Sequence, residues 1–123
     1  MRNLDTSINV ADYLEYGCNT LLPKAIRERF NGKQVLVHFD NYPCSEKSAT
    51  MKDWKGYAKQ VAAVNSPKTY GDLVKPYCKN AAKLIKAIDN GKLPNWDYIH
   101  TTNCLWVERI AIEGTEVELY IGS

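Results

Sequence analysis

The sequence lacks the short motifs by which many enzymes and metalloproteins are identified. Its seven glycines are isolated from one another, so there is no glycine-rich loop to hold a phosphate group. Only two histidines are present. The four cysteines, Cys18, Cys44, Cys78 and Cys104, form no Cys-x-x-Cys pair of the kind found in zinc ribbons and thioredoxin-like proteins. We therefore expect neither a metal site nor a cofactor.

Long apolar runs are absent as well. No stretch approaches the ~20 apolar residues of a membrane-spanning helix, and the residues after Met1 contain no signal-peptide core of ~7–15 apolar residues. These absences favour a cytoplasmic protein that makes no membrane contact and keeps its cysteines as free thiols. With 45% hydrophobic and 24% charged residues, the chain has the composition of one compact domain over residues 1–123.

The first thirty residues predict two short helices. Asn9 is a candidate N-cap for a helix over residues 10–16, and Gly17 is a candidate stop. A second helix is expected from about Thr20 to the Asn-Gly pair that follows Phe30, with a proline tolerated in its first turn.

Two more helices are predicted in the middle of the chain. Thr50, with an acid three residues later, has capping-box-like spacing for a helix that ends at the Ser-Pro pair 66–67. A longer helix ends at residues 90–91, and it either begins near Pro76 or is kinked there, because proline has no N–H. We favour a start at Pro76, with residues 69–75 as a preceding turn.

Strand patterns complete an α+β fold. Residues 34–39 carry apolar side chains on both faces, which predicts a central strand paired on both sides and covered by helices. Residues 104–121 predict a hairpin that turns at Glu113-Gly114. Its core face would hold Trp106, Ile110, Ile112, Val117, Leu119 and Ile121, and its other face Val107, Arg109, Glu116, Glu118 and Tyr120. Residues 97–102 could add a short strand. We expect a small, mainly antiparallel sheet packed against several helices.

Charge is distributed unevenly along the chain. Residues 47–92 contain ten lysines and three acids, a local charge of +7, whereas residues 1–46 carry −1 and residues 93–123 carry −4. Two lysine series repeat at helical spacing: Lys52, Lys55 and Lys59, then Lys75, Lys79, Lys83 and Lys86. Such stripes are either solvated faces of amphipathic helices or sites for an anionic partner, and the asymmetry would also suit self-association through opposite charges.

Two further positions could contribute to an anion site. Trp96 follows Asn95 in a loop-like stretch, where it could stack on a base or close an edge of the core. Arg109 lies in the middle of the hairpin, where it could bind a phosphate or form a cross-strand ion pair with Glu118.

Catalytic groups are scarce. His38 and Asp40 lie two residues apart at a strand end, with Cys44 nearby, which is a weak thiol–imidazole constellation. A strand histidine that satisfies a polar group at the rim of the sheet is the simpler interpretation.

The sequence therefore favours a non-enzymatic protein that captures a small anionic ligand of nucleotide type, as a phage or mobile-element protein sequestering a nucleotide signal would. We expect it to be a homo-oligomer, since the hairpin should offer an edge strand and Trp106, Val107 and Tyr120 should offer contact area. The alternatives are a protein-directed inhibitor or adaptor and a weakly specific nucleic-acid binder. The expected ligand-binding residues are Lys55, Lys59, Lys75, Lys79, Asn95, Trp96 and Arg109.

Overall fold

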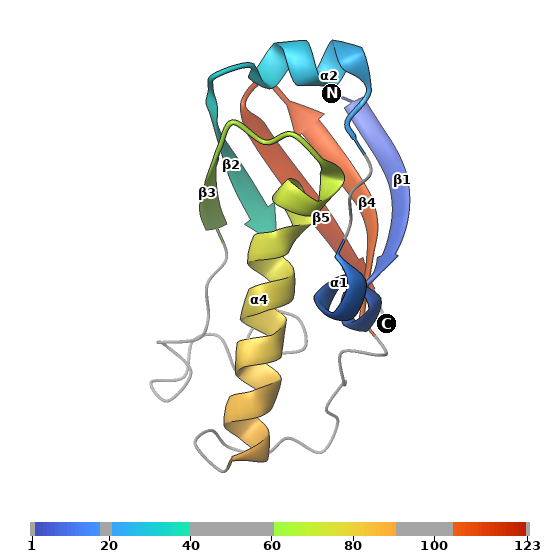
Figure 1. Ribbon diagram of the computed structural model, residues 1–123, viewed down its shortest axis with the longest axis vertical. Coiled ribbons are helices and arrows are strands. Elements are labelled where there is room, and N and C mark those ends of the chain that lie inside the picture. The colour runs from blue at the N-terminus through green and yellow to red at the C-terminus, as the bar shows by residue number, and fades with distance from the viewer. Residues whose placement is uncertain (1, 18–20, 40–60, 91–104, 123) are drawn as a thin grey trace.

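The computed structural model describes residues 2–17, 21–39, 61–90 and 105–122, which form three helices and one five-stranded sheet (Figure 1). In chain order the elements are β1 (Arg2–Asn9), α1 (Val10–Tyr16), α2 (Lys24–Phe30), β2 (Gln34–Phe39), β3 (Val61–Asn65), α4 (Tyr70–Asp89), β4 (Trp106–Glu113) and β5 (Glu116–Gly122). None of these helices is long and apolar enough to cross a membrane.

The strands lie in the order β1-β4-β5-β2-β3. β2 and β5 are parallel, and the other three neighbouring pairs are antiparallel. The predicted α+β fold with a mainly antiparallel sheet is confirmed. The expectation that the C-terminal hairpin supplies an edge strand is wrong, because β1 and β2 pair with its two outer sides. Among the described strands, the edges are β1 and β3.

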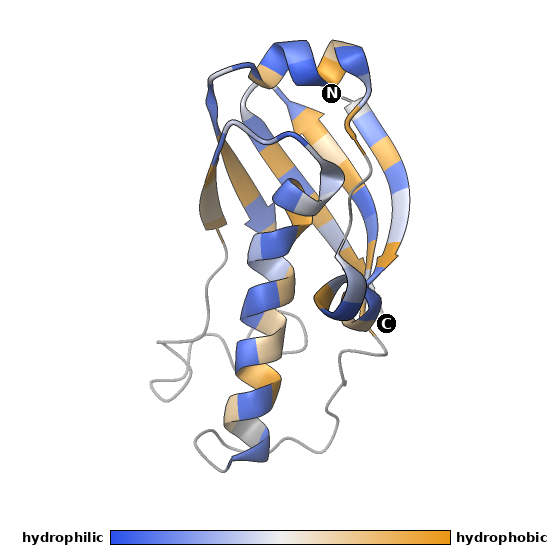
Figure 2. Cartoon of the chain, in the orientation of Figure 1, coloured by the Kyte–Doolittle hydropathy of each residue, from blue (hydrophilic) through white to orange (hydrophobic). Residues whose placement is uncertain are grey.

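α1 and α4 lie over one face of the sheet, which we call the inner face, and α2 lies across one end of the sheet (Figure 1). The α4 residues buried at helical spacing, Leu73, Tyr77, Ala81 and Leu84, point toward the core. The Tyr77 ring meets Phe39 of β2 edge to face, with centroids 5.6 Å apart. Figure 2 shows hydrophobic and hydrophilic residues alternating along the strands, as one-sided burial requires.

β2 itself contradicts the prediction of helices on both sides. Val35, Val37 and Phe39 are buried on the inner face, but Leu36 is 38% exposed. The predicted span and the pairing on both sides are confirmed. The opposite side of the strand is part of what we call the outer face of the sheet.

The N-terminal region is only partly as predicted. α1 has the predicted bounds: the Asn9 side chain accepts a hydrogen bond from the Asp12 amide, and Gly17 ends the helix at φ +76°. α2 begins four residues after Thr20, at Lys24, because Leu21 forms a β-bridge with Thr69 and the residue before Pro23 is kept out of helical geometry.

Two strands were not predicted. β1 pairs with β4, and its Leu4, Thr6 and Ile8 alternate with polar residues, a weak period-2 signal. β3 occupies Val61–Asn65, where the sequence pattern predicted the end of a helix. That prediction is wrong here because pairing with β2 overrides the local pattern; the first part of the predicted helix lies outside the described residues, as does the possible strand at 97–102.

α4 starts earlier than the sequence analysis predicted. It runs from Tyr70 and contains Pro76 in its interior, so the preference for a start at Pro76 is wrong. Thr69 and Asp72 cap the helix, since the Asp72 amide donates to Thr69 Oγ1 and the Thr69 amide donates to Asp72 Oδ2. These bonds fix the first turn ahead of the proline.

The hairpin is present, but its turn and register differ from the prediction. Gly114 and Thr115 form the turn, with Gly114 at φ +61°, and Glu113 pairs with Glu116. Arg109 therefore faces Tyr120, and the predicted pairing of Arg109 with Glu118 is wrong.

A bulge between Val107 and Arg109 reverses the sides of the two residues at the start of β4. Val107 is fully buried, whereas Trp106 is 38% exposed. The predicted assignment of Trp106 to the core and of Val107 to an oligomeric surface is wrong. Ile110, Ile112, Val117 and Leu119 are buried as predicted, and Ile121 packs against the core.

Candidate functional site

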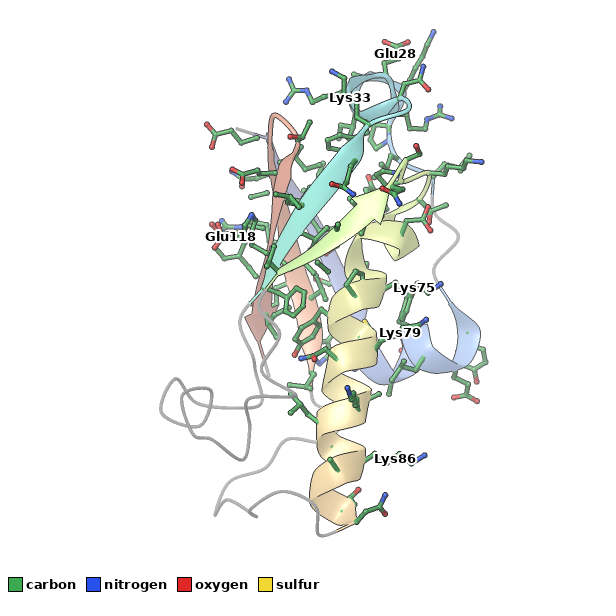
Figure 3. All side chains as sticks on the ribbon, turned by 90° about the vertical axis from the view of Figure 1, so that its left-hand side faces the viewer. Glu28, Lys33, Lys75, Lys79, Lys86 and Glu118 are labelled. Carbon is green, nitrogen blue, oxygen red and sulfur yellow. The ribbon has the colours of Figure 1, made fainter. Side chains whose placement is uncertain are left out.

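Lysines of α4 lie on one side of the sheet, and several carboxylates of the strands lie on the other. Figure 3 shows Lys75, Lys79 and Lys86 projecting from one side of α4, with Glu118 on the far side of the sheet. The register places further carboxylates on the outer face beside Glu118, namely Asp5, Glu113 and Glu116. The described lysines of α4 thus form a basic helix face, and the outer face of the sheet carries several carboxylates beside Arg109.

An open groove of about 490 Å³ lies between β3 and the first half of α4. Three of its lining residues are lysines: Lys68, Lys75 and Lys79. Its other walls are formed by Ala63, Val64, Asn65, Ser66, Asp72 and Pro76. The groove is the place in the described structure where predicted binding residues meet, because Lys75 and Lys79 both line it.

Helix geometry and a cap bring the three lysines together. Lys75 and Lys79 are four residues apart on α4, so their side chains leave the same face of the helix. Lys68 precedes the helix, and its backbone N–H donates to Asp72 Oδ2 at 2.7 Å. The cap therefore fixes the position of the Lys68 backbone relative to α4.

The groove is electropositive. All three lysine side chains are exposed, and Asp72 is the single acid among the described residues that line it. One Asp72 carboxylate oxygen already accepts two backbone N–H groups, from Lys68 and Thr69. Much of its hydrogen-bonding capacity is thus used internally, and three cations face one partly satisfied anion.

A second pocket, of about 290 Å³, adjoins the groove and shares Ser66 and Lys68 with it. Arg27 of α2 lines this second pocket together with the exposed Leu21. Ser66, at the junction, adopts φ +47°, a conformation uncommon for a residue other than glycine. Four cationic side chains line the two pockets between them: Arg27, Lys68, Lys75 and Lys79.

Sequence reasoning found two of these four cations. Lys68 and Arg27 were missed because neither belongs to a lysine series at helical spacing. The usable signal for Lys68 was the Thr69–Asp72 capping pair that follows it directly.

The remaining predicted binding residues are not in the groove. Arg109 lies on the outer face, where its guanidinium carbon sits 3.9 Å from the centroid of the Tyr120 ring. The sheet therefore separates it from Lys75 and Lys79. Lys55, Lys59, Asn95 and Trp96 lie outside the described residues.

Of the weak thiol–imidazole constellation of His38, Asp40 and Cys44, His38 alone is among the described residues. Its Nε2 is 3.4 Å from Glu116 Oε1 on the outer face, beside a small pocket of about 120 Å³. Asp40 and Cys44 lie outside the described residues, as do Cys18 and Cys104, while Cys78 is buried in the core. Within the described part of the chain, no three His, Cys, Asp or Glu side chains are grouped to hold a metal ion.

Comparisons of the chain with protein-family models, with curated proteins and with solved structures find no match.

Proposed function

We propose that the protein is a non-enzymatic binding protein that captures an anionic ligand in the groove between β3 and α4. The observation that carries this proposal is the convergence of Lys68, Lys75 and Lys79 on one open groove. Lys68 comes from the β3–α4 connection and Lys75 and Lys79 from α4, and all three line the same groove. Three ammonium groups around a concave site attract phosphate or carboxylate groups.

The chemistry of the groove supports recognition of anions more than recognition of bases. No aromatic ring is among the described residues that line the groove or the adjoining pocket. For a small-molecule ligand, the proposal is a nucleotide that acts as a signal and is sequestered in the cytoplasm. The protein that sequesters it would be a homo-oligomer of phage or mobile-element origin. Its base contacts would depend on Trp96 and Asn95, outside the described residues.

Weakly specific nucleic-acid binding has less support. A nucleic acid that wrapped the domain would meet Glu113, Glu116 and Glu118 on the outer face, and those carboxylates repel phosphates. Among the described residues, Lys75, Lys79 and Lys86 project from one side of α4, across the sheet from these carboxylates.

The proposal is tested with the double variant Lys75→Ala with Lys79→Ala. The probes are adenosine triphosphate and inorganic pyrophosphate, titrated by calorimetry at low salt. We expect affinity for both to fall by about tenfold, since each exposed charge pair contributes up to about 1 kcal/mol and two are removed. The matched control is Lys33→Ala with Lys86→Ala, which removes the same charge outside the groove.

The control variant should bind both probes within about twofold of the wild type, allowing for long-range electrostatics. Equal losses in the two double variants would show that net charge, and not the groove, determines binding. Unchanged affinity in the groove variant would reject the proposal.

A further inference from the structure

β3 is an edge strand, and it pairs with β2 alone among the described strands. An edge strand presents a row of N–H and C=O groups without sheet partners, which is a template for one more strand. Native edges are often protected by charged residues or proline. β3, with the sequence Val-Ala-Ala-Val-Asn, has neither.

The hydrogen bonding to β2 shows which β3 groups are already used. The Ser66 amide donates to the Lys33 carbonyl at 3.1 Å, so Ser66 directs its backbone N–H toward the β2 side, while the Lys33 amide donates to Phe30. In an antiparallel ladder, hydrogen-bonded and non-hydrogen-bonded pairs alternate. Continuing this register, Val64 and Ala62 direct their backbone groups toward β2.

The residues between them direct their backbone groups toward the open edge: Val61, Ala63 and Asn65. A bond on the far side of β2 agrees with this assignment. Leu36, which pairs with Ala63, donates its amide to Thr115 at 2.9 Å, away from β3.

The open edge and the lysine groove are the same place. Ala63 and Asn65, whose backbone groups face outward, both line the groove. The opposite wall carries Lys75 and Lys79, which Figure 3 shows on one side of α4. A chain segment added to β3 would therefore lie along α4, with its side chains within reach of the lysines.

We infer that the anionic ligand of the groove is an acidic, extended peptide segment of a partner protein, which adds to β3 as a sixth strand. This inference rests on the proposed function. A peptide supplies alternating N–H and C=O groups for the edge and carboxylates for the lysines, whereas a mononucleotide supplies only the anion. The adjoining pocket, which shares Lys68 and is lined by Arg27, offers a further cation to a ligand longer than the groove.

Charge excludes a second copy of the chain as the occupant. Two copies joined through β3 would bring both sets of Lys68, Lys75 and Lys79 against each other. Like charges at an interface cost several kcal/mol. An acidic strand reverses the sign of that interaction.

The deciding variant is Ala63→Pro. It removes one outward-facing N–H without touching the bonds between β2 and β3, and edge strands accept proline at such positions. Ala63→Val is the matched control, since it keeps the N–H and adds a β-branched side chain. The probes are a capped synthetic peptide of alternating glutamate and valine, the same peptide N-methylated at alternate residues, and inorganic pyrophosphate.

We expect Ala63→Pro to weaken peptide binding by tenfold or more and pyrophosphate binding much less, with Ala63→Val close to wild type for the peptide. The N-methylated peptide should bind wild-type protein as weakly as the unmodified peptide binds Ala63→Pro, a test that does not depend on the folding of a variant. Three results would overturn strand addition but leave the anion site standing. They are wild-type affinity of Ala63→Pro for the peptide, equal binding of the two peptides, and no peptide binding by a protein that binds pyrophosphate. Undiminished binding of every probe by Lys75→Ala with Lys79→Ala would instead reject the anion site.

Discussion

Thr69 and Asp72 hydrogen-bond to each other's backbone amides at the start of α4, at 3.1 and 3.2 Å. This reciprocal cap lets the helix begin six residues before Pro76. The missing N–H of Pro76 then falls inside a helix whose first turn is held by side chains. The same aspartate lines the groove, so it links the stability of the helix to the charge of the site.

Removing the cap should destabilise the domain. We expect Asp72→Ala to lower the free energy of unfolding by about 0.5–2 kcal/mol, because two backbone N–H groups lose their acceptor. Urea titration followed by circular dichroism measures this. Asp89→Ala, at the other end of α4, is the matched control and should cost less than about 0.5 kcal/mol. Equal losses would show that the cap contributes nothing specific.

A substitution at Asp72 that keeps the cap should strengthen anion binding. Asp72→Asn keeps an oxygen acceptor for the cap but removes a negative charge from the groove. We expect affinity for pyrophosphate to rise by about twofold to fivefold at low salt, because one exposed unit charge near a ligand contributes about 1 kcal/mol. The gain should shrink as salt screens the charge. Weaker binding in Asp72→Asn would place the anion away from this aspartate.

Because β2 is buried on one face only, alanine substitutions at its neighbouring residues Leu36 and Val37 should differ in their cost to stability. Val37→Ala should lower the free energy of unfolding by about 2 kcal/mol, since it removes a fully buried side chain and leaves a cavity. Leu36→Ala should cost less than about 1 kcal/mol, because Leu36 is on the open outer face. Chemical denaturation of both variants provides the measurement. Similar costs would show that something covers the outer face in solution.

Local signals were enough for the parts of the fold that depend on local chemistry. The caps of α1 at Asn9 and Gly17, the span of β2 and the lysine series containing Lys75 and Lys79 all follow from spacing along the chain. Each requires only neighbours within a few residues.

The missed features depend on distant partners. β1 and β3 are strands because β4 and β2 pair with them. Neither segment has a clear strand pattern of its own, since β1 has few apolar residues and β3 is short and contains two alanines, which have low strand propensity. The groove could not be foreseen either, since it forms only where the unpredicted β3 meets α4. Lys68 joins the site for the same reason.

The Arg109–Tyr120 contact predicts a structural role for a residue that the sequence suggested as a ligand contact. Tyr120→Ala should lower the free energy of unfolding by about 0.5–1 kcal/mol, the usual value of an exposed cation–π pair, together with some lost packing. Arg109→Ala should leave pyrophosphate affinity within about twofold of wild type, because the sheet lies between Arg109 and the groove. Calorimetry tests the second expectation. A tenfold loss would move the anion site to the outer face.

The bulge in β4 predicts opposite effects for lysine substitutions at the neighbouring positions Trp106 and Val107. An unbulged strand would place Trp106 in the core and Val107 on the surface, whereas the observed register buries Val107 completely and leaves Trp106 on the outer face. Val107→Lys should therefore abolish cooperative unfolding, since an unpaired charge cannot be buried in an apolar core. Trp106→Lys should fold, because its ammonium group would reach solvent on a face rich in carboxylates. Thermal unfolding followed by circular dichroism distinguishes the two variants. A folded Val107→Lys beside an unfolded Trp106→Lys would mean that the strand pairs without the bulge, with Arg109 shifted off Tyr120.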